Sequence, residues 1–155
     1  MVTFFAAAKK VTAAPHRGSA NRPTRNRDPA TKKPKPSKAE PMKVQQIKQS
    51  IAIEGLENWG TAGLPGPQEI KISGVQKVIP GSEAIDTGVF ECTPGTYRRS
   101  IKQAEVMHFL AGNGRFTPDG EDTIHFTGGD TLFFAANTEG TWEVDETMRK
   151  VYVIF

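Results

Sequence analysis

The sequence predicts an all-β fold, an antiparallel sandwich or barrel, for the part of the chain from residue 42 onward. Ten short runs rich in β-branched and aromatic residues follow one another there, at the spacing of roughly 8–12 residues that is typical of such folds. Turn signals such as Pro-Gly, Gly-Asn-Gly and Pro-Asp-Gly separate these runs. The 15 glycines and 11 prolines also disfavour a helical bundle, because both residues interrupt helices.

The expected elements begin with a lead-in segment. Residues 42–51 suit either a short amphipathic helix or an extended strand, and their pattern leaves both open. Residues 57–67 form a Gly/Pro-rich loop that lets Trp59 anchor the chain onto the domain. The expected strands then cover residues 69–72, 75–79, 87–92, 96–101, 104–111, 114–117, 123–127, 130–135, 140–145 and 147–154.

The net charge of +3 conceals two parts of opposite charge. Residues 1–40 carry ten Lys and Arg against Asp28 and Glu40, a net charge of +8, and the other 115 residues have a net charge of −5. Residues 1–41 also contain many prolines and few large apolar side chains. Such a segment cannot bury enough surface to offset the entropy of ordering, so we expect a disordered basic tail.

Three interpretations of this tail stay open. In the first, the tail is a solvated extension. In the second, residues 9–38 make weak contact with a polyanion such as nucleic acid, because flexible cations displace phosphate counterions. The third is a transit peptide, since MVTFFAAAKK opens with an apolar stretch and no acid precedes Asp28. No run approaches the ~18 apolar residues of a membrane span, so we expect a cytoplasmic protein with no membrane partner.

A series of motifs in the second half of the chain carries a family resemblance. In order they are GVFECTPG (88–95), EVMHFLAG (105–112), PDGE (118–121), GGDTLFFAANTEGTW (128–142) and RKVYVI (149–154). On these motifs the chain resembles the small cupins of the (S)-ureidoglycine aminohydrolase and ethanolamine-utilisation type. The resemblance implies a cupin double-stranded β-helix over residues 42–155, with its core motifs in 88–155, that often packs as a homodimer.

The metal ligands that the cupin resemblance implies are mostly absent from this sequence. The first cupin motif pairs His-x-His with a Glu and a Gly, and here Glu105 and Gly112 match its second half. Counting back from Glu105 places Arg98 and Ser100 where the two histidines would be, and in the second cupin motif Gly140 stands where a further histidine would be. Since Arg is not a metal ligand, we expect no metal or other cofactor, apart from a divalent ion held weakly.

The remaining histidines and the single cysteine do not restore a metal site. His108 has the opposite strand parity from Glu105, so it should point outward if Glu105 points inward. His125 lies on another strand and is expected to be a half-buried packing residue. Cys92 has no base nearby in sequence and is expected to be an inert buried thiol.

The candidate site is therefore a metal-free pocket around Glu105, which is the candidate catalytic residue. Its expected polar lining comes from Arg98, Ser100 and Tyr97, and its expected walls are Phe109, Phe133 and Trp142. An Arg beside a Glu at the base of an apolar barrel suits an anionic or zwitterionic metabolite. The alternative is structural: Glu105 is a buried carboxylate paired with Arg98 or Arg99.

Two classes of function follow from these observations. The first is a small-molecule cupin that binds such a metabolite, with an aminohydrolase-like reaction implied only by the resemblance. The second is a non-catalytic dimerising or sensing module whose basic tail contacts a partner or nucleic acid. The sequence leaves open whether the chain turns over a substrate.

Overall fold

The computed structural model describes residues 43–63 and 68–155, and this part of the chain is built almost entirely of β-strands. A single turn of 3-10 helix, η1 (Ser50–Ala52), precedes them. The strands are β1 (Glu57–Ala62), β2 (Ile70–Lys77), β3 (Asp86–Cys92), β4 (Gly95–Ile101), β5 (Glu105–Ala111), β6 (Asn113–Pro118), β7 (Ile124–Thr127), β8 (Thr131–Phe134), β9 (Thr138–Val144) and β10 (Met148–Ile154).

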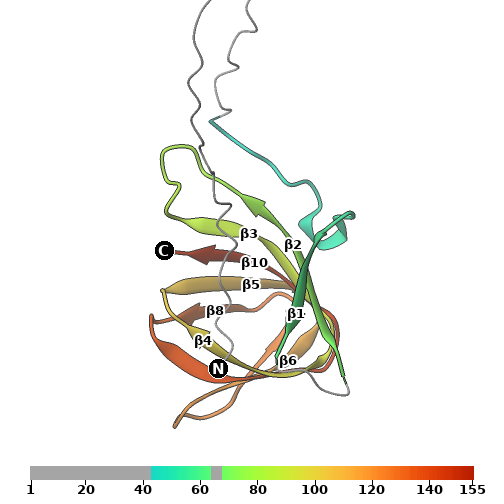
Figure 1. Cartoon of the computed structure of the whole chain (residues 1–155), viewed down its shortest axis with the longest axis vertical. Coiled ribbons are helices and arrows are strands. Elements are labelled where there is room, and N and C mark those ends of the chain that lie inside the picture. The colour runs from blue at the N-terminus through green and yellow to red at the C-terminus, as the bar shows by residue number, and fades with distance from the viewer. Residues whose placement is uncertain (1–42, 64–67) are drawn as a thin grey trace, which may run out of the picture. The chain divides into compact units, whose positions relative to one another are not determined.

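These strands form two sheets. The larger sheet has the order β1-β2-β3-β10-β5-β8, and Figure 1 shows most of these strands side by side. The smaller sheet has the order β4-β9-β6-β7. Every paired strand runs antiparallel to its neighbour. The all-β antiparallel prediction is confirmed.

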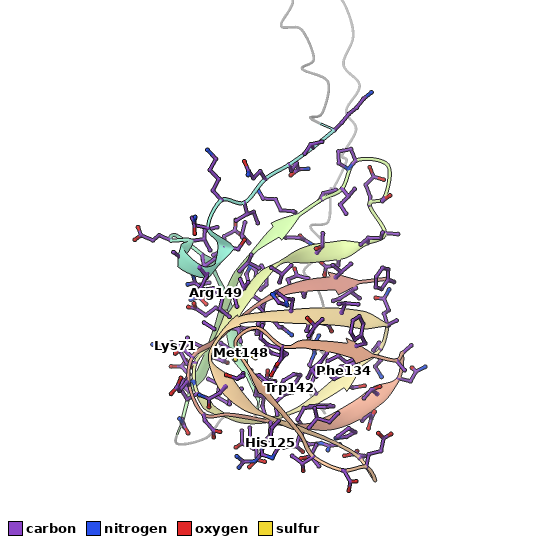
Figure 2. The ribbon with its side chains drawn as sticks, turned by 180° about the vertical axis from the view of Figure 1, so that it is seen from behind. Lys71, His125, Phe134, Trp142, Met148 and Arg149 are labelled. Carbon is purple, nitrogen blue, oxygen red and sulfur yellow. The ribbon has the colours of Figure 1, made fainter. Side chains whose placement is uncertain are left out.

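The core lies between the two sheets and is centred on Trp142 of β9 (Figure 2). The Trp142 ring lies 4.8 Å from the ring of Phe116, 5.5 Å from that of Phe126 and 5.9 Å from that of Phe134, centroid to centroid. Phe109 of β5 stacks on Phe126 at 4.2 Å. Because these side chains come from both sheets, the aromatic cluster holds the sheets together through buried apolar area.

The structure corrects the sequence prediction at β2. Residues 69–72 and 75–79 were expected to be two strands separated by a Ser-Gly turn, but Ile70–Lys77 is one continuous strand. A Cβ added to Gly74 would lie 2.3 Å from Trp59 Cη2. Gly74 therefore does not form a turn. Because it has no side chain, the Trp59 ring can approach the strand closely, which is another role of glycine inside strands.

The lead-in and the predicted loop also differ from expectation. Residues 43–49 form neither the helix nor the strand considered, and only η1 is regular. The first half of the predicted loop is strand β1, which pairs with β2 and shifts register between Asn58 and Gly60, where Gly60 has φ +95°. Trp59 does anchor this segment, since its ring packs 6.3 Å from that of Phe90.

The predicted basic tail, residues 1–41, lies outside the described residues. Within residues 43–63 and 68–155, no helix has the length and apolarity that a membrane crossing requires.

Candidate functional site

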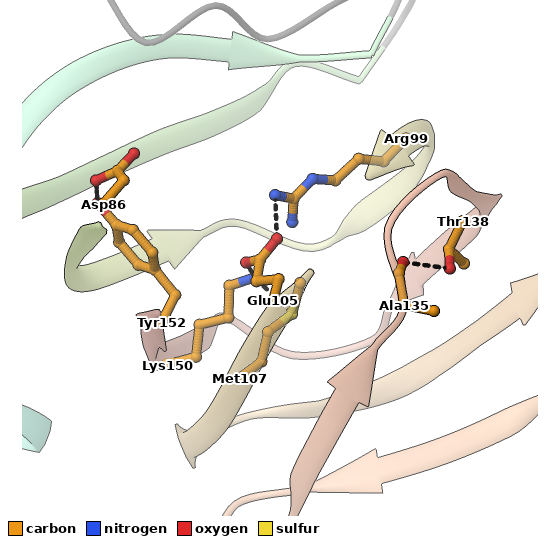
Figure 3. A network of polar contacts seen from close by, with 8 residues as sticks. All are labelled: Asp86, Arg99, Glu105, Met107, Ala135, Thr138, Lys150 and Tyr152. Atoms are coloured by element: carbon orange, nitrogen blue, oxygen red, sulfur yellow. Dashed lines mark hydrogen bonds and ion pairs between the residues drawn. The ribbon is translucent and has the colours of Figure 1, made fainter. Parts of the chain in front are cut away.

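Three strands place one acidic and two basic side chains together inside the barrel (Figure 3). Glu105 begins β5, Arg99 lies on β4 and Lys150 lies on β10. Arg99 Nη2 donates to Glu105 Oε2 at 2.7 Å, and Lys150 Nζ lies 3.5 Å from Glu105 Oε1. The side chains of Glu105 and Lys150 are each only 2% exposed, whereas that of Arg99 is 21% exposed. The cluster is thus buried, and Arg99 is its member nearest to solvent.

Strand alternation explains why these three side chains meet. Successive side chains of a strand point to opposite faces, and on β5 the inward positions are Glu105, Met107 and Phe109. On β10, Lys150 pairs with Phe90 of β3 and with Phe109 of β5, so it shares their inward face. On β4, Tyr97 and Ile101 are buried and Arg99 lies between them. One polar position on each strand therefore enters an otherwise apolar interior.

Lys150 has few polar partners for a buried ammonium group. Its Nζ lies 2.8 Å from the Met107 sulfur, a weak acceptor, and 5.0 Å and 5.6 Å from the ring centroids of Phe90 and Trp142. Burial lowers the pKa of Lys150 to about 8, and the Glu105 carboxylate offsets only part of this effect. A substantial fraction of Lys150 is therefore uncharged at slightly alkaline pH.

Donors outnumber acceptors around this cluster. A single carboxylate, that of Glu105, faces both the Arg99 guanidinium and the Lys150 amine. The indole Nε1 of Trp142 is also buried and has no hydrogen-bond partner among the described residues. Buried polar groups without partners are rare in folded proteins. The interior therefore has spare hydrogen-bond donors for one more acceptor group. An anion would suit these donors best.

Two further titratable groups in the interior are held in their neutral forms. Burial raises the pKa of the Cys92 thiol to about 11. Burial also raises the pKa of Tyr97 well above its ordinary value. The buried position of Cys92 agrees with the inert thiol expected from the sequence.

The structure corrects the positions of Arg98 and Ser100. Both were expected on the inner face, but Arg98 is paired with Asp119 in solvent, with 56% of its side chain exposed, and Ser100 Oγ donates to Glu139 at 3.3 Å. Counting back from Glu105 missed the inward positions of β4 by one residue. The reason is that the loop between β4 and β5 does not determine which alternate residues of β4 face the interior. Arg99 takes the place expected for Arg98, which agrees with the structural alternative of a Glu105–Arg99 pair.

The structure contradicts the expected position of one wall residue, Phe133. Tyr97, Phe109 and Trp142 lie in the interior, and their part in ligand binding stays a prediction. Phe133 was also expected there, but it is 77% exposed, because alternation along β8 turns Phe134 inward.

The residues present do not fit the metal that cupins commonly hold. The histidine position assigned to Gly140 is closed, since a Cβ there would lie 2.4 Å from Phe116 Cζ. His108 is exposed and contacts Thr131 at 2.9 Å, and His125 is exposed rather than half-buried. The described part of the chain contains no cluster of three or more His, Cys, Asp or Glu that could hold a metal. Beside Glu105, two basic side chains disfavour a divalent cation.

A groove of about 440 Å³ lies elsewhere, between the lead-in segment and the outer face of the larger sheet. Its lining includes Lys43 and Val44 from the lead-in, Lys77 at the end of β2, and Val89 and Val151 from β3 and β10. Val89 and Val151 have the opposite parity from Phe90 and Lys150, so β3 and β10 separate this groove from the charged cluster.

Comparisons with known proteins agree with the fold. The EutQ-like cupin domain family matches residues 80–152. The EutQ protein of Clostridium difficile has a similar structure, with a TM-score of 0.50 and 16% identity over 56% of this chain and 68% of that one. Ectoine synthase from P. lautus matches with a TM-score of 0.53 and 14% identity, over 72% of this chain and 76% of that one.

A third solved structure, a predicted oxalate decarboxylase of Thermotoga maritima, has a TM-score of 0.53 and 14% identity, over 71% of this chain and 98% of that one. No curated protein sequence matches the chain. The two-sheet barrel and these similarities show a cupin fold. More particularly, the chain resembles the small cupins of the ethanolamine-utilisation type, as its motifs predicted.

Proposed function

We propose that this cupin binds a small anionic or zwitterionic metabolite inside the barrel, with the carboxylate of the ligand held by Arg99 and Lys150. The observation that carries the proposal is the surplus of buried donors: two cations share the Glu105 carboxylate, and the buried Trp142 Nε1–H has no partner among the described residues. An anion entering this space would gain charge-assisted hydrogen bonds, which are roughly twice as strong as neutral ones.

Arg99 is the residue best placed to receive such a ligand. Its Nη2 bonds Glu105, and a guanidinium has further N–H groups in a planar fork that matches a carboxylate. Its partial exposure makes it the first member of the cluster that a ligand from solvent would reach. Glu105 then acts as a positioning residue that holds the guanidinium and the Lys150 amine on either side of itself.

The proposal concerns binding rather than a metal-assisted reaction. The aminohydrolase-like chemistry implied by the resemblance relies on a metal as Lewis acid, and this chain lacks the histidines for that role at the positions discussed above. The proposed ligand contacts need only the side chains of Arg99, Lys150 and Trp142.

The proposal is tested by measuring the binding of a panel of small carboxylates, by thermal shift and by calorimetry. The informative variants are Arg99→Met and Arg98→Met, because the two arginines are neighbours on β4 that face opposite sides. Arg99→Met should weaken binding about tenfold or more, since a hydrogen bond to a charged group contributes about 1.5–3 kcal/mol. Arg98→Met should leave the affinity unchanged. Equal affinity for both variants, or no carboxylate that binds, would refute the proposal.

A second candidate function, a dimerising module, is favoured by the outer face of the larger sheet. Phe133 is 77% exposed and lies directly opposite Val106, which in turn lies opposite Val153. A row of apolar side chains across three strands is a surface that commonly pairs with another protein. Sedimentation of Phe133→Glu should then show a monomer, with Ile124→Glu on the smaller sheet as the control; a monomeric wild type would rule this out.

A further inference from the structure

The inward face of β10 presents an amine in surroundings that suit a nucleophile. Lys150 Nζ is enclosed by the Met107 sulfur and by the rings of Phe90 and Trp142, and its nearest carboxylate oxygen is 3.5 Å away. The shorter and stronger bond of that carboxylate goes to Arg99 instead. An ammonium group in this position lacks the close acceptors that would stabilise its charge, and the neutral amine retains a free electron pair for attack.

We propose that Lys150 captures the carbonyl group of a small 2-oxo acid as an imine, while Arg99 holds the carboxylate of that acid. This inference rests on the proposed function, because it uses the same anion site and names the class of ligand. Arg99 and Lys150 contact different oxygens of the Glu105 carboxylate. The guanidinium and the amine therefore lie on the two sides of the Glu105 carboxylate, and a 2-oxo acid beside Glu105 would present its carboxylate to one and its adjoining carbonyl carbon to the other.

The step balances without any further reactant. The neutral Lys150 amine adds its electron pair to the carbonyl carbon, and one nitrogen proton is transferred to the carbonyl oxygen, which gives a carbinolamine. The hydroxyl group then leaves with a second nitrogen proton as water, and a C=N bond remains. Glu105 is positioned to relay each proton in turn, the first from the nitrogen to the carbonyl oxygen and the second from the nitrogen to the departing hydroxyl.

The surroundings of Lys150 support the step on every side. Glu105 faces it from β5, Arg99 from β4 and Cys92 from β3. Burial lowers the pKa of Lys150 to about 8, whereas the neutral Cys92 thiol does not compete as a nucleophile, because burial raises its pKa to about 11. A protonated imine would keep the positive charge of Lys150 opposite the Glu105 carboxylate.

Reductive trapping tests the inference directly. The full chain is incubated with glyoxylate, the smallest 2-oxo acid, and sodium cyanoborohydride, which reduces an imine to a stable carboxymethyl amine. Chymotryptic peptide mapping then locates the modification. We expect Lys150 to be modified at least tenfold faster than the average of the exposed lysines. The rate at Lys150 should reach half its maximum near pH 8, whereas modification of ordinary lysines should still rise above pH 9.

Two variants and a matched ligand make the result decisive. Lys150→Arg and Lys150→Met, each checked for folding by circular dichroism, should lose the fast-labelled site and keep the slow background. Labelling spread evenly over the lysines of the wild type would overturn the inference. Glycolate has the same carboxylate but no carbonyl group, so it tests the anion site alone. If glycolate stabilises the wild type and not Arg99→Met while Lys150 stays unlabelled by glyoxylate, the inference fails and the proposed function stands.

Discussion

Arg99 on the smaller sheet donates to Glu105 on the larger sheet at 2.7 Å, so this ion pair links the two layers of the barrel. Lys150 approaches the other oxygen of the same carboxylate (Figure 3). Because Glu105 and Lys150 are almost fully buried, their energetics are those of an interior cluster and not of a surface salt bridge. Four predictions depend on this arrangement and on the ligand positions around it.

Glu105→Gln should destabilise the fold. The substitution keeps the volume but leaves Lys150 and the largely buried Arg99 without a counter-charge. Breaking a buried pair by removing one partner costs about 3–5 kcal/mol, and the partial exposure of Arg99 places the expected loss near the lower end, at about 3 kcal/mol. Urea unfolding at pH 7 measures it. A change below about 1 kcal/mol would mean that water solvates the cluster.

The two neighbouring arginines of β4 should respond differently to the same substitution. Arg99→Met removes the partner of a buried carboxylate and should lower the melting temperature by several degrees, since about 1 kcal/mol corresponds to roughly 2–8 °C in domains of this size range. Arg98→Met removes an exposed pair with Asp119 and should leave the melting temperature unchanged. Differential scanning calorimetry of both variants checks this, and equal shifts would contradict the assigned faces of β4.

Lys150→Met should be more stable than the wild type at pH 7, and the difference should narrow as the pH rises. In the fold Lys150 loses its proton near pH 8, whereas in the unfolded chain it keeps the proton to about pH 10.4. Below pH 8 the fold therefore carries the full cost of the buried charge, at most about 3 kcal/mol, and this cost declines between pH 8 and 10.4.

Unfolding free energies of the wild type and Lys150→Met at several pH values between 7 and 9.5 measure this narrowing. Cys92 titrates in both proteins, so its contribution largely cancels in the difference. A difference that stays constant over this range would show that Lys150 keeps an ordinary pKa.

Metal binding should be weak. Protein without a histidine tag, dialysed against Mn, Fe, Ni or Zn salts and then against buffer, should retain much less than one equivalent by elemental analysis. The physical reason is that Arg99 and Lys150 stand beside Glu105, and that Phe116 fills the space beside Gly140. One tightly held transition metal per chain would contradict this expectation.

The positions of most strands could be predicted from local sequence, and the exceptions have a common cause. The runs from β3 to β10 match their predicted ranges to within about two residues, since turn residues separate them. The Ser-Gly pair at 73–74 resembled a turn, but Gly74 makes room for Trp59, which lies on another strand. Local sequence does not distinguish a glycine that turns the chain from one that admits a distant ring.

The candidate site was predictable only in part. Glu105 was identified through its motif, and Tyr97, Phe109 and Trp142 were placed correctly in the interior. Lys150 was missed. Both faces of β10 carry apolar residues, with Met148 and Tyr152 on the face of Lys150 and Val151 and Val153 on the other. The period of two therefore gave no sign that Lys150 points inward.

The sequence by itself determined the all-β class, the order of most strands and the resemblance to small cupins, because turn chemistry, composition and motifs are local properties. Only the tertiary structure decided which parity of each strand faces the core. That choice depends on the pairing of Lys150 with Phe90 and Phe109, and on the contact of β4 with β5 through Arg99 and Glu105. A shift of one residue exchanges the two faces of a strand. For this reason Arg99, and not Arg98, meets the buried carboxylate.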